Sequence, residues 1–168
     1  MRERYWSMYT TIKHKERYYR FYFMRAKRIN NFVVNFLLVC SFGGIGSWII
    51  LNHQPFSWIW ASITAIAQVF QALSHRSPYA KQDAALRFLC PQLSKLLLEI
   101  DSDWLKIELQ LYSEKRIEKL VSAYQSKYDE ISSRYTANLD MPINKSCNEK
   151  AAEECINFFK HNYHVQKG

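Results

Sequence analysis

Residues 32–51 have the sequence FVVNFLLVCSFGGIGSWIIL, and residues 56–73 have the sequence FSWIWASITAIAQVFQAL. Both stretches lie within residues 29–75, a run of 47 residues that contains no Asp, Glu, Lys or Arg. A membrane-spanning helix needs about 20 mostly apolar residues, and Pro55 breaks the polar turn between the two stretches. The sequence therefore predicts a transmembrane hairpin, in preference to a buried helical pair of a soluble protein or a cleaved signal peptide.

The averages over all 168 residues hide this segment, because 23% charged residues and a mean hydropathy of -0.31 are typical of a soluble domain. Residues 1–28 hold nine Lys and Arg against two Asp and Glu, whereas residues 76–168 hold 14 against 13. Most of the formal charge of +8 thus precedes the first span. Basic residues also follow the second span, and the turn between the spans has none. By the positive-inside rule we expect both termini in the cytoplasm.

The expected fold is an all-α membrane protein with four segments. Residues 1–31 form a basic, aromatic amphipathic helix next to the membrane, and residues 32–74 form the hairpin. Residues 77–138 form cytosolic helices, and residues 139–168 form a C-terminal helix and tail that complete a cytosolic helical bundle. Cys40 lies in the first span and the other three cysteines lie on the reducing cytoplasmic side, so we expect four free thiols.

The N-terminal segment repeats apolar and aromatic residues at helical spacing, from Tyr5, Tyr9 and Ile12 onward. Its mixture of rings and cations suits a bilayer surface or packing against other helices, and it also suits nucleic acid or a solvated spacer. A basic face is expected to contact a partner or phosphate groups. Its residues are Arg17, Arg20, Arg25, Lys27 and Arg28.

The segment after the hairpin contains helix signals. Ser77 and Pro78 indicate a helix start, and Pro91 suggests an end. Two heptad seams follow, at residues 93, 97, 100, 104, 107 and 111 and at residues 117, 121, 124, 128, 131 and 135. The six-residue step between them predicts either a turn near Ser113 or a phase shift in one helix. The last helix is expected over residues 148–163, with one apolar face formed by Ala152, Cys155, Ile156, Phe159 and Tyr163.

Catalytic motifs are missing from the sequence, so we expect neither an enzyme nor a cofactor. A zinc site formed by Cys147, Cys155, His161 and His164 is disfavoured, because their spacing matches no common zinc motif. We expect no metal.

The second span carries a polar stripe at helical spacing, and amides in hydrocarbon need hydrogen-bond partners. The stripe therefore either lines a pore or holds the hairpin together, with an amide of the first span as a further partner. Its residues are Ser57, Ala61, Thr64, Gln68, Gln71 and His75, joined by Asn35. In the first span, small residues allow close helix packing, which favours a homo-oligomer. These are Cys40, Gly43, Gly44 and Ser47, with Ala61 of the second span.

A basic helix around Tyr18, Tyr19 and Arg20, two close spans with SFGGIGS at residues 41–47, and a helix from Ser77 and Pro78 resemble the SLATT group. This group comprises two-span effectors of bacterial anti-phage systems, including effectors beside retron reverse transcriptases. The resemblance covers roughly residues 1–135.

The resemblance implies a toxic effector of abortive infection that is held inactive by a cytosolic partner or signal, then oligomerises and permeabilises the inner membrane. The partners implied are the lipid bilayer, further copies of the chain, and an inhibitory or activating complex that carries nucleic acid, such as a reverse transcriptase with its nucleic acid. The alternatives are a non-conducting membrane anchor or adaptor for a cytosolic complex, and a holin-like or toxin–antitoxin membrane toxin.

Overall fold

The computed structural model describes residues 1–50, 62, 65–69, 78–137, 139 and 141–163. Every regular element in these residues is an α-helix, in agreement with the all-α prediction. The helices are α1 (Arg2–Ile50), α3 (Pro78–Glu108), α4 (Glu114–Thr136) and α5 (Lys145–Tyr163). The chain divides into two compact units, one of residues 1–24 and 82–168 and one of residues 25–81.

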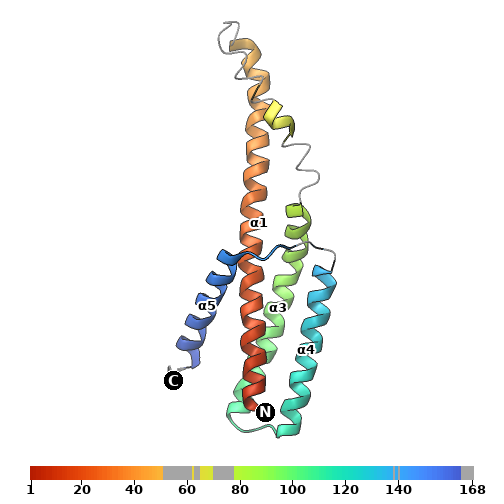
Figure 1. Ribbon diagram of the computed structural model, residues 1–168, viewed down its shortest axis with the longest axis vertical. Coiled ribbons are helices and arrows are strands. Elements are labelled where there is room, and N and C mark those ends of the chain that lie inside the picture. Colours follow the sequence, from red (N-terminus) through yellow and green to blue (C-terminus); the bar gives the residue numbers. More distant parts are fainter. Residues whose placement is uncertain (51–61, 63–64, 70–77, 138, 140, 164–168) are drawn as a thin grey trace. The chain divides into compact units, whose positions relative to one another are not determined.

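The larger unit is a bundle in which α3 and α4 lie side by side with the N-terminal part of α1, and α5 packs on α1 (Figure 1). Its core is a continuous cluster of aromatic and aliphatic side chains from all four helices. The predicted first seam is buried at Leu93, Leu97, Ile100, Trp104 and Ile107. Heptad spacing places these residues on one stripe of α3, so they bury together.

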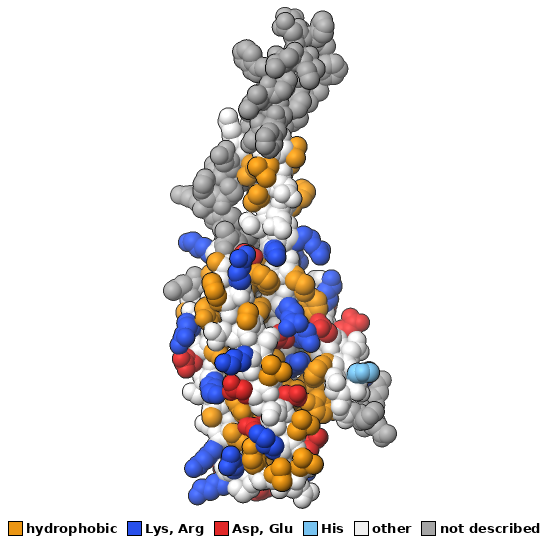
Figure 2. Space-filling model, turned by 180° about the vertical axis from the view of Figure 1, so that it is seen from behind, with side chains coloured by type: hydrophobic (Ala, Val, Ile, Leu, Met, Phe, Trp, Pro, Cys, Tyr) orange, Lys and Arg blue, Asp and Glu red, His pale blue; other side chains and the backbone are white. Residues whose placement is uncertain are grey.

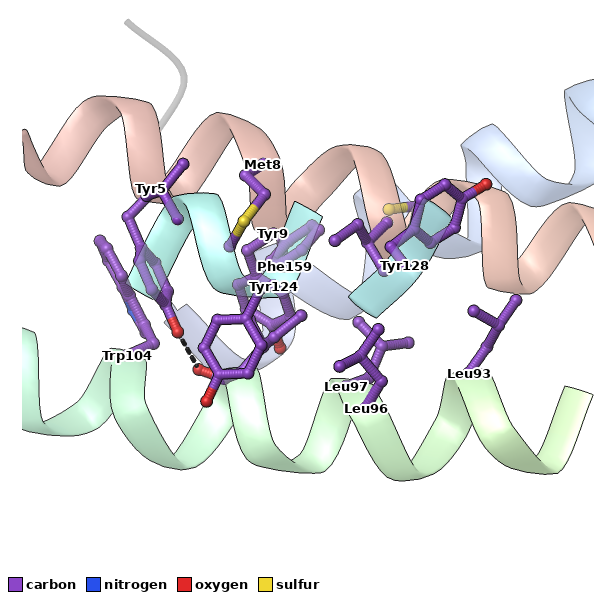
Figure 3. Close-up of a cluster of buried hydrophobic side chains, with 14 of the residues drawn as sticks. Tyr5, Met8, Tyr9, Leu93, Leu96, Leu97, Trp104, Tyr124, Tyr128 and Phe159 are labelled. Carbon is purple, nitrogen blue, oxygen red and sulfur yellow. Dashed lines mark hydrogen bonds between the residues drawn. The ribbon is translucent and has the colours of Figure 1, made fainter. Parts of the chain in front are cut away.

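The N-terminal segment belongs to this bundle. Tyr5, Tyr9 and Ile12 are at most 3% exposed, and Figure 3 shows the two tyrosines among side chains of the other helices. The N-terminal part of this segment therefore packs against other helices, which is one of the roles considered for it above.

The two seams belong to separate helices. Helix α3 ends at Glu108, and α4 starts at Glu114 with Ser113 as its N-cap residue. Gln110 in the connection has a φ of 57°, a left-handed conformation that reverses the chain. The alternative of a turn near Ser113 is therefore correct. Because Leu111 lies in this turn, it is 66% exposed and not part of the core, contrary to the predicted seam.

Pro91 lies inside a helix, whereas the sequence predicts that the helix ends there. Helix α3 runs through it from Pro78 to Glu108, and Pro78 is its first residue, as predicted. A proline inside a helix removes one backbone hydrogen bond and costs about 3 kcal/mol. Leu89 and Leu93 on either side are fully buried, and their packing offsets this cost.

The last helix begins earlier than predicted, at Lys145, because the Asn144 side chain accepts a hydrogen bond from the Cys147 backbone N–H and caps the first turn. Its buried face also differs from the prediction. The face is rotated so that Ile156 is 53% exposed and Ala152 is only partly buried. The buried residues are Cys147, Ala151, Cys155 and Phe159.

The smaller unit contains the remainder of α1, which is helical to Ile50, and a helical segment at residues 65–69. Within the part of the chain that the structure describes, no helix is long and apolar enough to cross a membrane. The predicted spans at residues 32–51 and 56–73 include many residues that lie outside this part or whose side chains are not described.

Candidate functional site

Among the described residues of the bundle, one carboxylate is deeply buried, that of Glu16 of α1, whose exposed fraction is 1%. Arg20 donates to Glu16 Oε1 at 2.7 Å, and the Ser94 hydroxyl of α3 donates to the same oxygen at 3.1 Å. Arg17 Nε lies 3.6 Å from Oε2. A buried charge is tolerated only when it is paired and hydrogen-bonded. These contacts meet that condition and fix α1 against α3.

A second ion pair joins α5 to α1. Arg17 Nη1 lies 2.8 Å from Glu154 Oε1 of α5, so Arg17 connects a core carboxylate to a surface one. One turn earlier on α1, the Lys13 ammonium lies 3.9 Å from the centre of the Phe158 ring of α5. Cations over aromatic faces are attracted by the ring quadrupole. Both contacts hold α5 through charged groups of the N-terminal helix.

Aromatic rings complete the junction between α1, α3 and α5. The Trp6 ring lies 4.8 Å from Trp104 and 4.9 Å from Phe159. Asp101 accepts hydrogen bonds from Tyr9, at 2.9 Å, and from Tyr163. Burial raises the pKa of Tyr9 well above its ordinary value, and burial with the Asp101 hydrogen bond raises the pKa of Tyr163 to about 12. Both phenols therefore stay protonated and donate to Asp101 at neutral pH.

A separate network fixes the turn between α3 and α4. Asp103 accepts hydrogen bonds from Tyr124 at 2.8 Å, from Tyr112 at 3.1 Å and from Lys106 at 2.9 Å. Burial acts to raise the pKa of Asp103, but these donors outweigh burial and hold it below the ordinary value. The carboxylate form is thus the one that stabilises the turn.

Replacement Asp103→Asn should destabilise the bundle by about 1 to 2 kcal/mol at pH 7, because hydrogen bonds to a charged acceptor are lost. A lowered carboxyl pKa stabilises the fold above about pH 4 and loses that contribution as the pH falls through the folded-state pKa. The difference in free energy of unfolding between wild type and Asp103→Asn should therefore shrink below about pH 4, as measured by urea unfolding followed by circular dichroism. Asp129→Asn, at an exposed position on α4, is the control. A difference in free energy of unfolding that does not depend on pH would contradict the conclusion that the charged form of Asp103 stabilises the turn.

The predicted basic face is divided in its contacts. Arg17 and Arg20 are engaged in the ion pairs of Glu16, so they serve the bundle itself. Arg25, Lys27 and Arg28 are exposed on α1. Figure 2 shows Lys and Arg side chains interspersed with Asp and Glu over one face of the bundle, with no uninterrupted basic surface there. Arg20 is exposed as well, but its guanidinium is already paired with Glu16, so Arg25, Lys27 and Arg28 are the better candidates for contact with an anionic partner.

The predicted polar stripe lies largely outside the described residues. Gln68 is exposed in the helical segment 65–69, and Asn35 is exposed on α1. The other stripe residues are not described, so the expected contact of Asn35 with the stripe cannot be placed. They are Ser57, Ala61, Thr64, Gln71 and His75. The backbone of the small residues of the first span is helical, but their side chains are not described. These are Cys40, Gly43, Gly44 and Ser47.

The described cysteines are Cys90, Cys147 and Cys155, and all three are free thiols. Burial raises the pKa of Cys90 to about 11, so this thiol is neutral and poorly reactive at physiological pH. Among the described residues, no group of three His, Cys, Asp or Glu side chains is placed to hold a metal ion.

Sequence reasoning missed Glu16 and its partners. A signal was present, because Glu16 lies on the apolar stripe of α1 four residues after Ile12, with Arg20 four residues further on. An acid at a core position of a basic helix indicates a buried ion pair. No family model matches this chain, and no curated protein or solved structure matches it either.

Proposed function

We propose that this chain is an effector of bacterial anti-phage defence that permeabilises the inner membrane through a transmembrane hairpin, under the control of its cytosolic helical bundle. The observation that carries the proposal is the run of 47 residues without formal charge, flanked by basic residues on both sides. Such a run costs little in hydrocarbon, and basic flanks retain both ends on the cytoplasmic side. The resemblance to the SLATT group supplies the biological role.

The described start of the first span supports a lipid environment. Along α1, Phe32 is 70% exposed, Val34 46%, Leu38 51% and Val39 71%. These large apolar side chains occupy several faces of one helix in a stretch with no charge. Soluble proteins rarely expose such continuous apolar surface, whereas lipid covers it at no cost.

The proposed permeation path uses the polar stripe of the second span. Gln68 is exposed in a helical segment, beside Ile66 and Val69, which are 50% and 58% exposed. An amide among apolar side chains in a membrane needs protein or water as its partner. In an oligomer, Thr64, Gln68 and Gln71 supply that polar lining, and the pairs Cys40 with Gly44 and Gly43 with Ser47 allow the helices to pack closely.

The bundle is the proposed regulatory part. Its four helices are joined by a buried core and by ion pairs that tie the N-terminal and C-terminal segments together. A restraining complex, such as a reverse transcriptase with its nucleic acid, would contact the exposed cations Arg25, Lys27 and Arg28. Because α1 continues from the bundle through residue 50, this helix is the proposed connection between the bundle and the first span.

The second candidate is a non-conducting anchor for a cytosolic complex. It is favoured by leucines exposed on α3 and after it, which offer a partner surface without any need for a pore. Leu98 is 71% exposed, Leu105 51% and Leu109 70%.

The test is membrane potential in cells that express the chain alone, followed with a voltage-sensitive dye. Wild type should depolarise the cells, and Gln68→Leu with Gln71→Leu should reduce the depolarisation at least roughly tenfold, because each glutamine that loses its amide removes a water-binding group from the path. The matched control is Ser62→Leu with Ser74→Leu, which alters polar residues off the stripe. Unchanged depolarisation in the glutamine variant would remove the pore-lining assignment.

A further inference from the structure

A pocket of about 270 Å³ lies between α1, α3 and α5, where the C-terminal helix meets the other two. Its wall on α1 carries the cations Lys13, Arg17 and Arg20. They occupy positions i, i+4 and i+7, which fall on one face of a helix. Leu97 and Leu98 of α3 and Phe158 of α5 add apolar side chains to the lining. The pocket therefore combines positive charge with an apolar surface.

The two carboxylates in the pocket wall are already engaged. Glu16 is bound by Arg20 and Ser94, and Asp101 accepts hydrogen bonds from Tyr9 and Tyr163. The three cations still outnumber these two carboxylates in the pocket wall. Arg20 binds Glu16 through Nη2, and a guanidinium has five N–H donors in total, so it keeps donors for a ligand.

Of the three cations in the pocket wall, Lys13 is the one that forms no ion pair with a described carboxylate. Its ammonium lies over the Phe158 ring at 3.9 Å. Burial, followed by the nearby charge of Arg17, lowers the pKa of Lys13. The charges of Glu16 and Asp101 act in the opposite direction but do not outweigh these two causes, so an anion placed beside the ammonium would stabilise its charged form.

We propose that this pocket binds a small organic oxyanion, in which a phosphoryl or carboxylate group contacts Lys13 and the arginine side chains while an aromatic or aliphatic part packs on Leu97, Leu98 and Phe158. A cation would meet three positive charges against two carboxylates, and a wholly apolar ligand would leave the Lys13 ammonium without an anionic partner. The volume is that of a small molecule and excludes a folded macromolecule. Because Phe158 and the Arg17 partner Glu154 both belong to α5, occupancy would also strengthen the attachment of this helix.

The inference does not depend on the membrane function, and calorimetric titration of the purified full chain in detergent tests it. The probes are phenyl phosphate, benzoate, inorganic phosphate and phenol. Phenyl phosphate and benzoate should bind saturably, inorganic phosphate more weakly because it lacks the apolar part, and phenol least because it lacks the charge.

The decisive variant is Lys13→Met, which keeps the aliphatic stem and removes the ammonium. It should weaken phenyl phosphate binding at least about tenfold. Lys15→Met is the matched control, because Lys15 is exposed, lies over Tyr128 and does not line this pocket. Circular dichroism of both variants without ligand shows whether the bundle is intact. Equal affinity in wild type and a folded Lys13→Met variant, or no saturable binding of either organic anion to wild type, would overturn the proposal.

Discussion

Replacing Tyr5 with alanine is expected to lower the free energy of unfolding of the bundle by about 3 to 5 kcal/mol, as large-to-small changes of buried aromatic residues do. The Tyr5 side chain is completely buried, and its ring stacks on Trp104 at a centroid distance of 5.9 Å (Figure 3). It also meets Tyr124 of α4 edge-on at 6.3 Å. One residue near the N-terminus thus contacts both other long helices of the bundle.

A conservative variant separates packing from hydrogen bonding at the same position. The Tyr5 hydroxyl donates to the Ile100 carbonyl at 2.9 Å, so Tyr5→Phe should cost only about 1 kcal/mol. Phe88→Ala, at a position that is 61% exposed, should change stability by less than about 0.5 kcal/mol. Urea unfolding of the full chain in detergent, followed by circular dichroism, measures all three. A Tyr5→Ala effect as small as that of Phe88→Ala would contradict the packing of the N-terminal segment in the bundle.

Replacing residues 32–74 by an unrelated two-span hairpin of equal length should abolish depolarisation, although the chimera should still sediment with membranes. The reason is that the proposed path depends on Thr64, Gln68 and Gln71, whereas attachment to the bilayer depends only on length and apolar character. Full depolarisation by the chimera would contradict the hairpin as the permeating element. Retained protection against phage without depolarisation would favour the anchor.

The sequence predicted the helices of the bundle well where apolar spacing was regular. Leu93, Leu97, Ile100, Trp104 and Ile107 repeat at intervals of three and four, and all of them are buried. Periodicity reports which stripe of a helix is apolar, and burial of that stripe then follows without further information.

Positions at helix ends were predicted less well, because tertiary contacts decide them. Leu111 continues the seam in spacing but lies in the turn set by Gln110, and Pro91 lies within a helix that its neighbours stabilise on both sides. In α5, the contact of Phe159 with Trp6 and Tyr9 fixes the rotation of the helix and leaves Ile156 exposed. These contacts of Phe159 join residues more than 140 positions apart in the sequence, so the local pattern of apolar residues cannot predict them.

The polar junction was the part of the site least accessible to sequence reasoning. Arg17 and Arg20 were assigned to a partner surface on charge alone, and the structure pairs both with Glu16 and one with Glu154. A count of charged residues does not show which of them form ion pairs with other helices of the bundle. The pocket beside Lys13 was likewise not expected, because its three walls come from α1, α3 and α5.

The central claim, a hairpin that crosses the bilayer twice with the bundle on the cytoplasmic side, is tested most directly by single-cysteine labelling. The four native cysteines are replaced by alanine. The chain also carries Gln68→Leu with Gln71→Leu, so that the protein does not permeabilise the membrane to the labelling reagent. Asn52→Cys then marks the predicted turn, and Ile143→Cys marks a position that is 88% exposed between α4 and α5. In intact spheroplasts, a membrane-impermeant maleimide should label Asn52→Cys, and should label Ile143→Cys only after lysis. Labelling of both positions, or of neither, before lysis would contradict the account.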